Sequence, residues 1–429
     1  MNILILGGNG FIGSETVAAC LRRGHAVRAL GRNIDNSAAR MPDAVWIRKD
    51  ISTLVTPENW LPLLADTEVV INCAGALQDG ARDDVKALQF TAMAALYETA
   101  SQRGGIRFVQ VSANTMEGLD AGNSDFLASK GKADAALAAS GNSYTILRPG
   151  LVVGRNAHGG TAMMRAIASI PRILPVIFDD KPCQTADIED LVRYIADAAE
   201  GQHGDDTDFA VASSRVPNFR QASIQIRRWL GIHDETIINP GSAFAMMLAK
   251  TADLSGLLGW RSPMRSTALG VLAHGVTVDP EKPLLETRPL EETLSRNPAG
   301  VQDLWQARLY LVKPLIIITL SGFWLISGML ALLNLSGAIG YFEPTGLGHQ
   351  TALVMIVATA LLDCLLGALV LIRRHARLAM LGMILLSLFY LAGSLVFLPA
   401  LWLDPIGPMV KAIPSIVLTL VGLAILDER

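Results

Sequence analysis

Lys130 and Phe126, in the segment NSDFLASK at residues 123–130, lie at a spacing that is used for acid–base chemistry. With a tyrosine four residues before it, a lysine can lower the pKa of the phenol and make the hydroxyl a general acid. This chain has Phe126 at that position, and phenylalanine has no hydroxyl group. The segment therefore leaves three alternatives: a proton donor has been lost, none was ever needed, or the spacing is a coincidence.

A glycine-rich turn near the N-terminus is the second candidate for chemistry. Residues 2–6 are an apolar run typical of a buried parallel strand, and GGNGFIG follows, with Gly7, Gly10 and Gly13 spaced three apart. Residues 14–24 continue with helical spacing. Such a turn needs glycine because the chain bends tightly, a pyrophosphate approaches the backbone, and the helix packs against its strand. The segment therefore predicts a dinucleotide site at a helix N-terminus.

The residue after the second predicted strand bears on the choice of cofactor. NAD-binding sites usually place an acidic residue about 20 positions past the glycines, where it accepts hydrogen bonds from the ribose hydroxyl groups. This chain has Arg32 there, and a guanidinium suits a 2′-phosphate, which favours NADP over NAD. A solvated Arg32 is the alternative, and Asp35 lies nearby. Asp50 is a candidate contact to the adenine amino group, and an ordinary turn aspartate is equally consistent with the pattern.

The elements that must position these residues alternate along the first part of the chain. Ala74 and Gly75 follow one predicted strand and are small enough to let a dinucleotide cross the strand ends. Strands are predicted at residues 2–6, 26–30, 44–47, 68–72 and 106–111, and a helix at 83–103. Repeated strand–helix units predict an α/β fold: a Rossmann-type parallel sheet with helices on both faces. The ligand should lie across the carboxyl ends of the strands.

Taken together, these segments resemble the extended and atypical short-chain dehydrogenases/reductases, among them the nucleotide-binding accessory subunit of respiratory complex I. The resemblance covers about residues 1–235 and rests on GGNGFIG, INCAG, VSA, SK, TILRPGLVVG (145–154) and ADIEDLV (186–192). It implies that Lys130 binds the nicotinamide ribose, that the Ser112 hydroxyl polarises the substrate, and that residues 149–152 contact the nicotinamide. It assigns these cofactor contacts: Gly7, Gly10, Phe11, Ile12, Gly13, Arg32, Ala74, Gly75, Lys130 and Pro149.

Phe126 is the departure from this family, because active members have the acid–base tyrosine there. Tyr97 and Tyr144 are the nearest tyrosines in sequence and are predicted to be packing residues, while Asp125 and Ser129 only flank the position. A water, a proton-carrying substrate, or a flavin-like or quinone-like acceptor could replace the missing donor. The sequence therefore leaves open whether the chain is an enzyme. The four cysteines and seven histidines form no cluster, so no metal site is expected.

The last third of the chain changes character, with almost no charge over long stretches. Four apolar segments, at about 314–335, 351–372, 378–398 and 406–426, each have the length needed to cross about 30 Å of hydrocarbon as a helix. The fourth is the weakest, because it contains Pro408, Lys411 and Pro414. The span number and Asp363 within the second span resemble the DoxX-like four-helix membrane domain. Asp363 could relay a proton or contact a quinone headgroup, or it could only fix helix packing.

Basic residues predict the orientation of these spans. Arg308 and Lys313 precede the first span, and three arginines lie between the second and third, whereas 336–350 and 399–405 contain no Lys or Arg. The positive-inside rule therefore places the N-terminal domain and the C-terminus in the cytoplasm, at the inner (plasma) membrane. The N-terminus lacks the features of a signal peptide, which agrees with that orientation. The net charge of −3 argues against nucleic acid as a partner.

The sequence thus predicts three segments: an NAD(P)-binding domain at 1–235, a connector or substrate lobe at 236–308, and a four-helix transmembrane domain at 309–429. The connector is expected either to lie near the membrane surface or to be an ordinary soluble lobe. One hypothesis is a membrane-anchored NADP(H)-dependent oxidoreductase acting on a lipid, isoprenoid or quinone-type substrate. The other is a non-catalytic NADP(H)-binding module that stabilises or senses and docks to a membrane protein partner. A transporter gated by nucleotide is a weaker third.

Overall fold

The computed structural model divides the chain into two compact units. It describes residues 1–75, 84–114, 125–234, 236–260, 262, 264–405 and 407–427. The first unit comprises Met1–Leu254 and Ser262–Ala307, and the second comprises Ser255–Arg261 and Arg308–Arg429. The predicted domain boundaries at 235 and 308 stay predictions.

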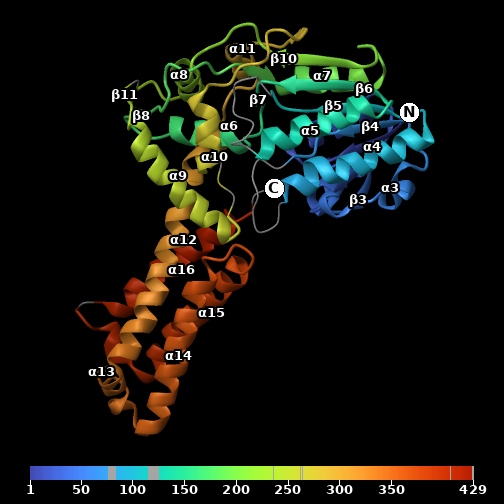
Figure 1. Cartoon of the computed structure of the whole chain (residues 1–429). Coiled ribbons are helices and arrows are strands. Elements are labelled where there is room, and N and C mark those ends of the chain that lie inside the picture. Colours follow the sequence, from blue (N-terminus) through green and yellow to red (C-terminus); the bar gives the residue numbers. More distant parts are fainter. Residues whose placement is uncertain are drawn as a thin grey trace. The chain divides into compact units, whose positions relative to one another are not determined.

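One parallel sheet organises the first unit (Figure 1). Its strand order is β12-β10-β6-β5-β4-β1-β2-β3, so the chain runs outward from β1 in one direction through β2 and β3, and in the other through β4, β5 and β6. The strands are β1 (Asn2–Leu6), β2 (Ala26–Gly31), β3 (Val45–Arg48), β4 (Val69–Asn72), β5 (Arg107–Val111), β6 (Ser143–Pro149), β10 (Thr207–Ala212) and β12 (Leu284–Glu286). The order reverses at β1, and parallel α/β sheets bind ligands at the carboxyl ends of the strands at such a point.

Helices cover both faces of the sheet, as predicted. They are α1 (Phe11–Arg22), α2 (Asp35–Arg40), α3 (Pro57–Leu64), α4 (Ala92–Arg103), α5 (Asp125–Ala139), α6 (Gly159–Ala168), α7 (Ile188–Ala199) and α8 (Phe219–Trp229). A π-helical turn at Ala87–Thr91 leads into α4. The helix expected at 83–103 is therefore confirmed over its described part, while Asp83 lies outside the described residues. The five predicted strands match the observed ones to within about one residue at each end.

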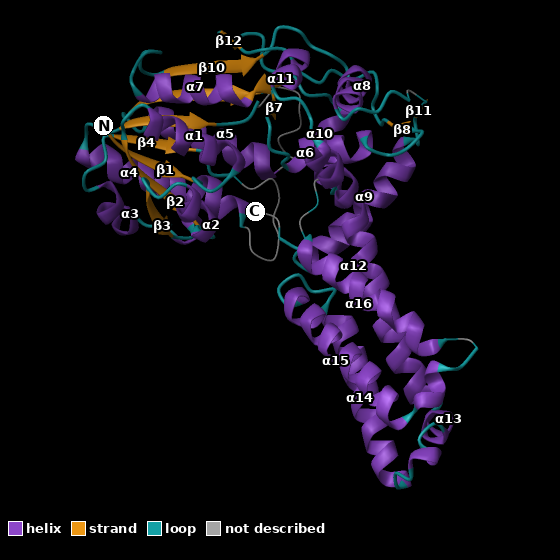
Figure 2. Cartoon of the chain, turned by 180° about the vertical axis from the view of Figure 1, so that it is seen from behind, coloured by secondary structure: helices purple, strands orange, loops and turns teal. Residues whose placement is uncertain are grey.

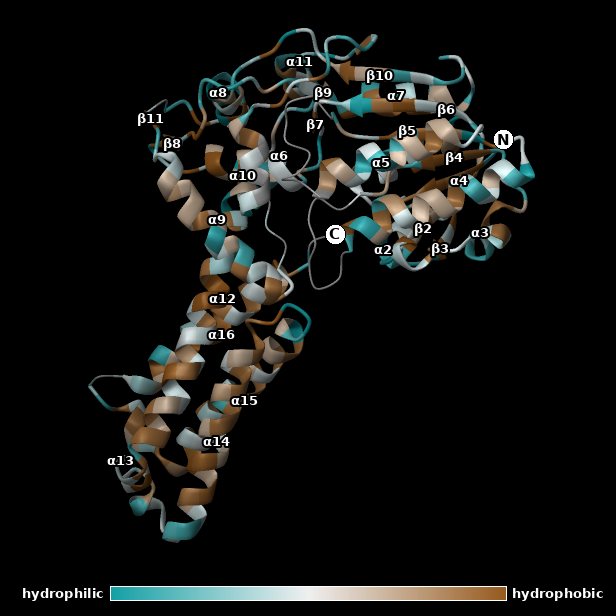
Figure 3. Ribbon diagram, in the orientation of Figure 1, coloured by the Kyte–Doolittle hydropathy of each residue, from teal (hydrophilic) through white to brown (hydrophobic). Residues whose placement is uncertain are grey.

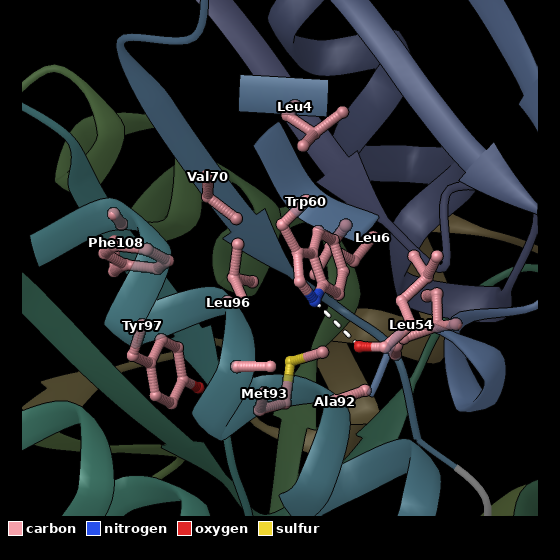
Figure 4. Close-up of a cluster of buried hydrophobic side chains, with 14 of the residues drawn as sticks. Leu4, Leu6, Leu54, Trp60, Val70, Ala92, Met93, Leu96, Tyr97 and Phe108 are labelled. Atoms are coloured by element: carbon pink, nitrogen blue, oxygen red, sulfur yellow. Dashed lines mark hydrogen bonds between the residues drawn. The ribbon is translucent and has the colours of Figure 1, made fainter. Parts of the chain in front are cut away.

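Two apolar cores hold these layers together. On one face, Trp60 of α3 and Leu96 of α4 pack against Leu4 and Val70 of the sheet (Figure 4). The Trp60 indole is fully buried, and its Nε1 donates a hydrogen bond to the Leu54 carbonyl (2.9 Å). On the other face, the side chains of α1 and α7 pack against alternate residues of the same strands. A sheet buried on both faces requires strands that are continuously apolar, as residues 3–6 are.

Smaller elements complete the first unit. Strand β7 (Leu151–Val153) pairs with β9 (Thr185–Asp187), and β8 (Leu174–Pro175) pairs with β11 (Ile237–Ile238), in both cases parallel. The stretch predicted as a connector contains α9 (Ser242–Leu257), α10 (Ser266–Ala273), β12 and α11 (Leu290–Arg296). Because β12 pairs with β10, this stretch supplies the outermost strand of the main sheet.

The second unit consists of helices among its described residues (Figure 2). They are α12 (Val301–Leu333, which begins within the first unit), α13 (Leu335–Gly340), α14 (His349–Leu369), α15 (Ala376–Phe397) and α16 (Pro408–Ala424). Helices α12, α14 and α15 are long and apolar enough to cross a membrane, and hydrophobic residues predominate along α14 and α15 (Figure 3). The fourth predicted span is observed as a shorter apolar helix of 17 residues.

Candidate functional site

The glycine-rich turn between β1 and α1 brings the backbone of two strands close together. Gly7 has a φ of +71°, and a Cβ there would lie 2.9 Å from the Ala74 Cα at the end of β4. A Cβ on Gly13 would lie 2.1 Å from the Gly7 carbonyl oxygen. Both positions exclude any larger residue, because such a contact forces the backbone apart. The Gly10 N–H donates to the Gly7 carbonyl (2.8 Å), which closes the turn.

Helix α1 begins at the edge where this turn ends. Gly10 is its N-cap and has no side chain that could cap the helix. Phe11 is the first helical residue, and its ring stacks on the His158 imidazole with centroids 5.4 Å apart and planes inclined by 15°. Ile12 packs against Val192 and Ile188 of α7. The helix is thus fixed on its strand by apolar contacts, with its N-terminus at the carboxyl end of β1. An anion is favoured there by the helix dipole and amide groups.

Two arginines lie at the carboxyl ends of β2 and β3. Arg32 follows β2, and its Nη1 is 3.9 Å from Asp50 Oδ2, with about a third of each side chain exposed. Arg48 ends β3, donates from Nη1 to the Arg32 carbonyl (3.3 Å), and forms an ion pair with Asp35. Asp50 caps the short turn Ile51–Thr53, because its Oδ1 accepts hydrogen bonds from the Ser52 N–H (3.1 Å) and hydroxyl (2.8 Å). The adenine contact assigned to Asp50 stays a prediction.

Lys130, on α5, reaches the ends of the two central strands. Its Nζ donates to the carbonyl of Ala74 after β4 (3.1 Å) and to that of Val111 at the end of β5 (2.9 Å). A Cβ on Gly75 would come within 3.8 Å of the same Nζ. The side chain is buried, and burial lowers the pKa of the ammonium, an effect that Asp134 partly offsets. An ammonium has three donors, and these two carbonyls occupy two of them and fix its position.

Ser112 belongs to a buried polar network. Its Oγ donates to Asp134 Oδ2 (2.5 Å), and Arg148 Nη1 lies 2.9 Å from the same carboxylate oxygen. Arg148 also pairs with Asp208, which in turn pairs with Lys282 (2.7 Å). Burial raises the pKa of Asp134, while Arg148 and the Ser112 hydroxyl act against that rise. The Ser112 proton is therefore committed to a carboxylate, so in this arrangement its hydroxyl can accept a hydrogen bond but does not donate one to a substrate.

Phe126 is half-buried on α5, one helical turn before Lys130. Tyr97 does not replace the missing hydroxyl, because it is buried in the core and donates to the Gln110 side chain (3.2 Å). Tyr144 packs against the same core. Both tyrosines are thus packing residues, as predicted. Ser129 donates to Gln89 (2.8 Å), and nothing is described for the side chain of Asp125.

Sequence reasoning missed three residues that the fold brings to this region: Asp134, Arg148 and His158. Asp134 follows Lys130 by four residues, so both carboxylate and ammonium lie on one face of α5, and this spacing was available as a signal. Arg148 precedes Pro149, whose carbonyl accepts a hydrogen bond from Asn114 (3.1 Å). His158 gave no signal, because its contact with Phe11 joins residues far apart in the chain.

The residues present fit a dinucleotide. The two glycine positions leave no room for a side chain where the pyrophosphate would approach, and a helix N-terminus follows them. Lys130 is held at the ends of β4 and β5 by two backbone carbonyls. The segments at 76–83 and 115–124, which follow these two strands, lie outside the described residues.

Comparisons with known proteins agree with this geometry. The NAD(P)H-binding family matches residues 7–169, and the DoxX-like family matches residues 321–420. The Bordetella bronchiseptica enzyme WbmH, solved with NAD+, is 17% identical over 70% of this chain and 96% of its own, with a TM-score of 0.51. WbmG from the same organism, solved with NAD, is 17% identical over 72% and 95%, also with a TM-score of 0.51. No curated protein matched by sequence.

These matches identify the two parts of the chain. It carries an NAD(P)-binding domain with the fold of the short-chain dehydrogenases/reductases, followed by a DoxX-like domain with membrane-length helices. The likeness to the solved structures extends to the fold alone at this level of identity.

Proposed function

We propose that this protein is a membrane-anchored, NADP(H)-dependent oxidoreductase that works without a tyrosine at position 126. The position of Lys130 carries the proposal. A buried ammonium costs free energy, and here two backbone carbonyls hold it at the carboxyl ends of β4 and β5. In this proposal it binds the nicotinamide ribose there. A protein that only needed a filled core would be more stable with an apolar side chain there.

The preference for NADP over NAD rests on the two arginines beyond β2 and β3. Arg48 donates a hydrogen bond to the Arg32 carbonyl, so the two arginines are neighbours. A 2′-phosphate could displace Asp50 as the partner of Arg32, or Asp35 as the partner of Arg48. We expect Arg32→Ala to weaken NADPH binding about tenfold or more and to leave NADH binding nearly unchanged. Arg40→Ala, at an exposed position on α2, is the control and should change neither.

When bound, NADPH would supply a hydride, and the chain would have to manage the accompanying proton differently from tyrosine-containing relatives. The acceptor could take its proton from water, which suits a quinone-type, lipid or isoprenoid substrate that a membrane anchor would concentrate. The membrane-length helices indicate association with a lipid bilayer. The distribution of basic residues supports the proposal that the site faces the cytoplasm at the inner membrane.

A non-catalytic nucleotide-binding module is the second candidate, and two observations favour it. Phe126 supplies no acid, and the Ser112 hydroxyl is bonded to Asp134 instead of being free to polarise a substrate. In this reading the bound nucleotide would stabilise or signal, and the membrane helices would dock a protein partner.

Single-turnover oxidation separates the two candidates. The full chain, purified in mild detergent with its own lipids, would be titrated with NADPH and NADH and then mixed with a quinone or a lipid extract. The enzyme is supported if the absorbance of bound NADPH falls in the parent protein and in Lys132→Ala but not in Lys130→Ala. Lys132 is an exposed lysine on the same helix. Tight binding without oxidation supports the module if Phe126→Tyr stays inactive as well. Gained turnover in Phe126→Tyr would instead imply a site otherwise built for hydride transfer. No binding of either nucleotide contradicts both.

A further inference from the structure

Helix α9 turns its larger apolar side chains outward. Ala245 and Ala249 are buried on its inner face, where they pack with Leu269 of α10. Four large apolar side chains on the opposite face are 38–62% exposed: Phe244, Met247, Leu248 and Leu254. Their spacing of three, four and six or seven residues places them along one stripe of the helix. We define these four residues as the α9 stripe.

The α9 stripe is unusual for a helix whose other face is packed. A surface helix of a soluble protein normally turns its apolar residues inward and its polar residues outward, whereas here the buried residues are small alanines. Met246 and Leu257, beside the stripe, are exposed as well. A contiguous exposed apolar surface of this kind marks a contact with another molecule or with a membrane.

The end of α9 shows which of these contacts applies. Residues 255–261 belong to the second unit, and α9 passes from the first unit into the second as one helix. The Leu258 carbonyl accepts the Arg373 N–H (3.0 Å), directly after α14. Trp260 Nε1 donates to the Leu371 carbonyl (2.6 Å). The residues directly after α9 are thus bound at one end of the membrane-length helices.

Trp260 is positioned as a tryptophan at a membrane interface would be. Its ring lies 5.6 Å from the Arg373 guanidinium and 5.9 Å from the Lys313 Nζ, while its body packs on the apolar residues of the bundle. Indole rings with an apolar body and a polar rim favour the headgroup level, and basic residues there attract anionic lipid. On α9 itself, Lys250 is exposed at the border of the stripe, where its long side chain can reach the headgroups.

We propose that the α9 stripe is a lipid-binding surface that lies in the boundary between headgroups and acyl chains, as interfacial amphipathic helices do. The occupant is the bilayer, because Leu254 is followed within a few residues by Leu258 and Trp260, which are bound at the end of the spans. The proposal is independent of the proposed reaction. It gives residues 242–257 a role in membrane contact, in addition to the spans.

Spin-label accessibility in the full chain tests this surface. Met247→Cys and Leu254→Cys would be labelled with a nitroxide, and the protein would be reconstituted into bilayers of zwitterionic lipid with a fraction of anionic lipid. Leu61→Cys is the matched control, because Leu61 is 57% exposed on α3, close to the 57% of Met247 and 62% of Leu254. Labelling of the parent protein gives the background from the native cysteines. Unchanged NADPH binding shows that each variant is folded.

The relative effect of oxygen and of a water-soluble nickel chelate on the label decides the outcome. If α9 lies in the interface, oxygen should relax the labels at 247 and 254 several-fold more than the chelate does, and the order should reverse at 61. Higher accessibility to the chelate at 247 and 254 overturns the proposal, since the stripe would then face water. Labels that are immobilised and shielded from both reagents overturn it as well, because a second copy or another protein would then cover the stripe.

Discussion

Lys130 and Asp134 lie one helical turn apart on α5, and together they explain how a charged side chain is kept inside this site. The carboxylate offsets part of the cost of burying the ammonium, and Arg148 then balances the carboxylate. Such a chain of buried charges is stable only if every member keeps its partner, because an unpaired buried charge costs far more than the pair gains. Asp134 is therefore expected to be a positioning residue for both Lys130 and Ser112.

Replacing Asp134 by asparagine tests this network. The amide keeps the shape but loses the charge, so Arg148 loses one of its two carboxylate partners and Lys130 loses the charge that offsets its burial. We expect a loss of about 2 kcal/mol, seen as a fall of several degrees in the melting temperature of the purified protein, and weaker NADPH binding. Asp66→Asn, at an exposed position, should change neither quantity. An unchanged melting temperature in Asp134→Asn would show that the network is not coupled.

Cys73 offers a test by pH, because it lies between β4 and Ala74 beside the turn. Burial raises the pKa of its thiol to about 11, and the Thr16 hydroxyl and the Lys130 ammonium only partly offset this effect. An ordinary thiol, with a pKa near 8.5, becomes mostly thiolate above about pH 9. At Cys73 the thiolate fraction, and with it the alkylation rate, should instead keep rising about tenfold per pH unit from 7 to 10.

Peptide mass spectrometry after timed alkylation would measure that rate. Cys183 is the internal control, because it is fully buried and its pKa is about 12, so its rate should rise with a similar slope. NADPH should slow the reaction at Cys73 and leave Cys183 unaffected. A rate at Cys73 that levels off near pH 9 would contradict the raised pKa.

Residue types near the turn could be predicted from the sequence, whereas their partners could not. The glycines, Arg32 and Lys130 belong to spacings with a physical reason, and the structure places them at the carboxyl ends of the central strands. The commitment of the Ser112 proton to Asp134 was not visible, because it depends on how α5 lies against β5. The contact of His158 with Phe11 likewise joins two segments whose distance the sequence does not set.

At the scale of elements, the turn between β1 and α1 is the most constrained part of the first unit. Its shape depends on glycines, which have no side chain, so the sequence predicted it directly. For the same reason, adding a side chain there should disrupt it. The π-helical turn at Ala87–Thr91, before α4, is the opposite case, because no sequence pattern predicted it. Predicted strand ends differ from the observed ones by about one residue, because the ends of elements are less sharply defined than their centres.

Gly13→Ala is the sharpest test of this turn. The added methyl group would lie 2.1 Å from the Gly7 carbonyl oxygen, so α1 must move away from β1 or the turn must open. We expect NADPH affinity to fall more than tenfold, as measured by fluorescence titration. Gly160→Ala is the matched control, because a Cβ there meets no atom within 4 Å, and its affinity should equal that of the parent. Equal affinity in both variants would show that the pyrophosphate does not use this turn.

At the scale of the whole molecule, composition separated the two parts of the chain correctly but not their details. The charged first part forms the sheet, and the apolar last part forms helices of membrane length. The segment at 236–308 was the least readable, because it contributes to both units: β12 extends the sheet, and residues 255–261 join the second unit. Short segments that contribute to two units show neither the alternating pattern of a strand nor an apolar stretch long enough for a membrane span.

Several basic residues of the second unit lie at one end of it. The Leu426 carbonyl accepts hydrogen bonds from Lys313 (3.1 Å) and Arg373 (2.9 Å), and Arg377 pairs with Asp427 (2.6 Å). The connections at 336–350 and 399–405 contain no Lys or Arg. Because cytoplasmic segments carry the excess of basic residues, this end should face the cytoplasm.

Cysteine labelling would determine this orientation. Tyr341→Cys, at a position 62% exposed after α13, should react with a membrane-impermeant maleimide in intact cells. Leu61→Cys, 57% exposed on α3, should react only after the membrane is permeabilised. The parent protein provides the background from the native cysteines. The reverse pattern would reject the orientation, and it would also place the NAD(P)-binding domain outside the compartment that supplies reduced nicotinamide cofactor, so the proposed oxidoreductase reaction would fall with it.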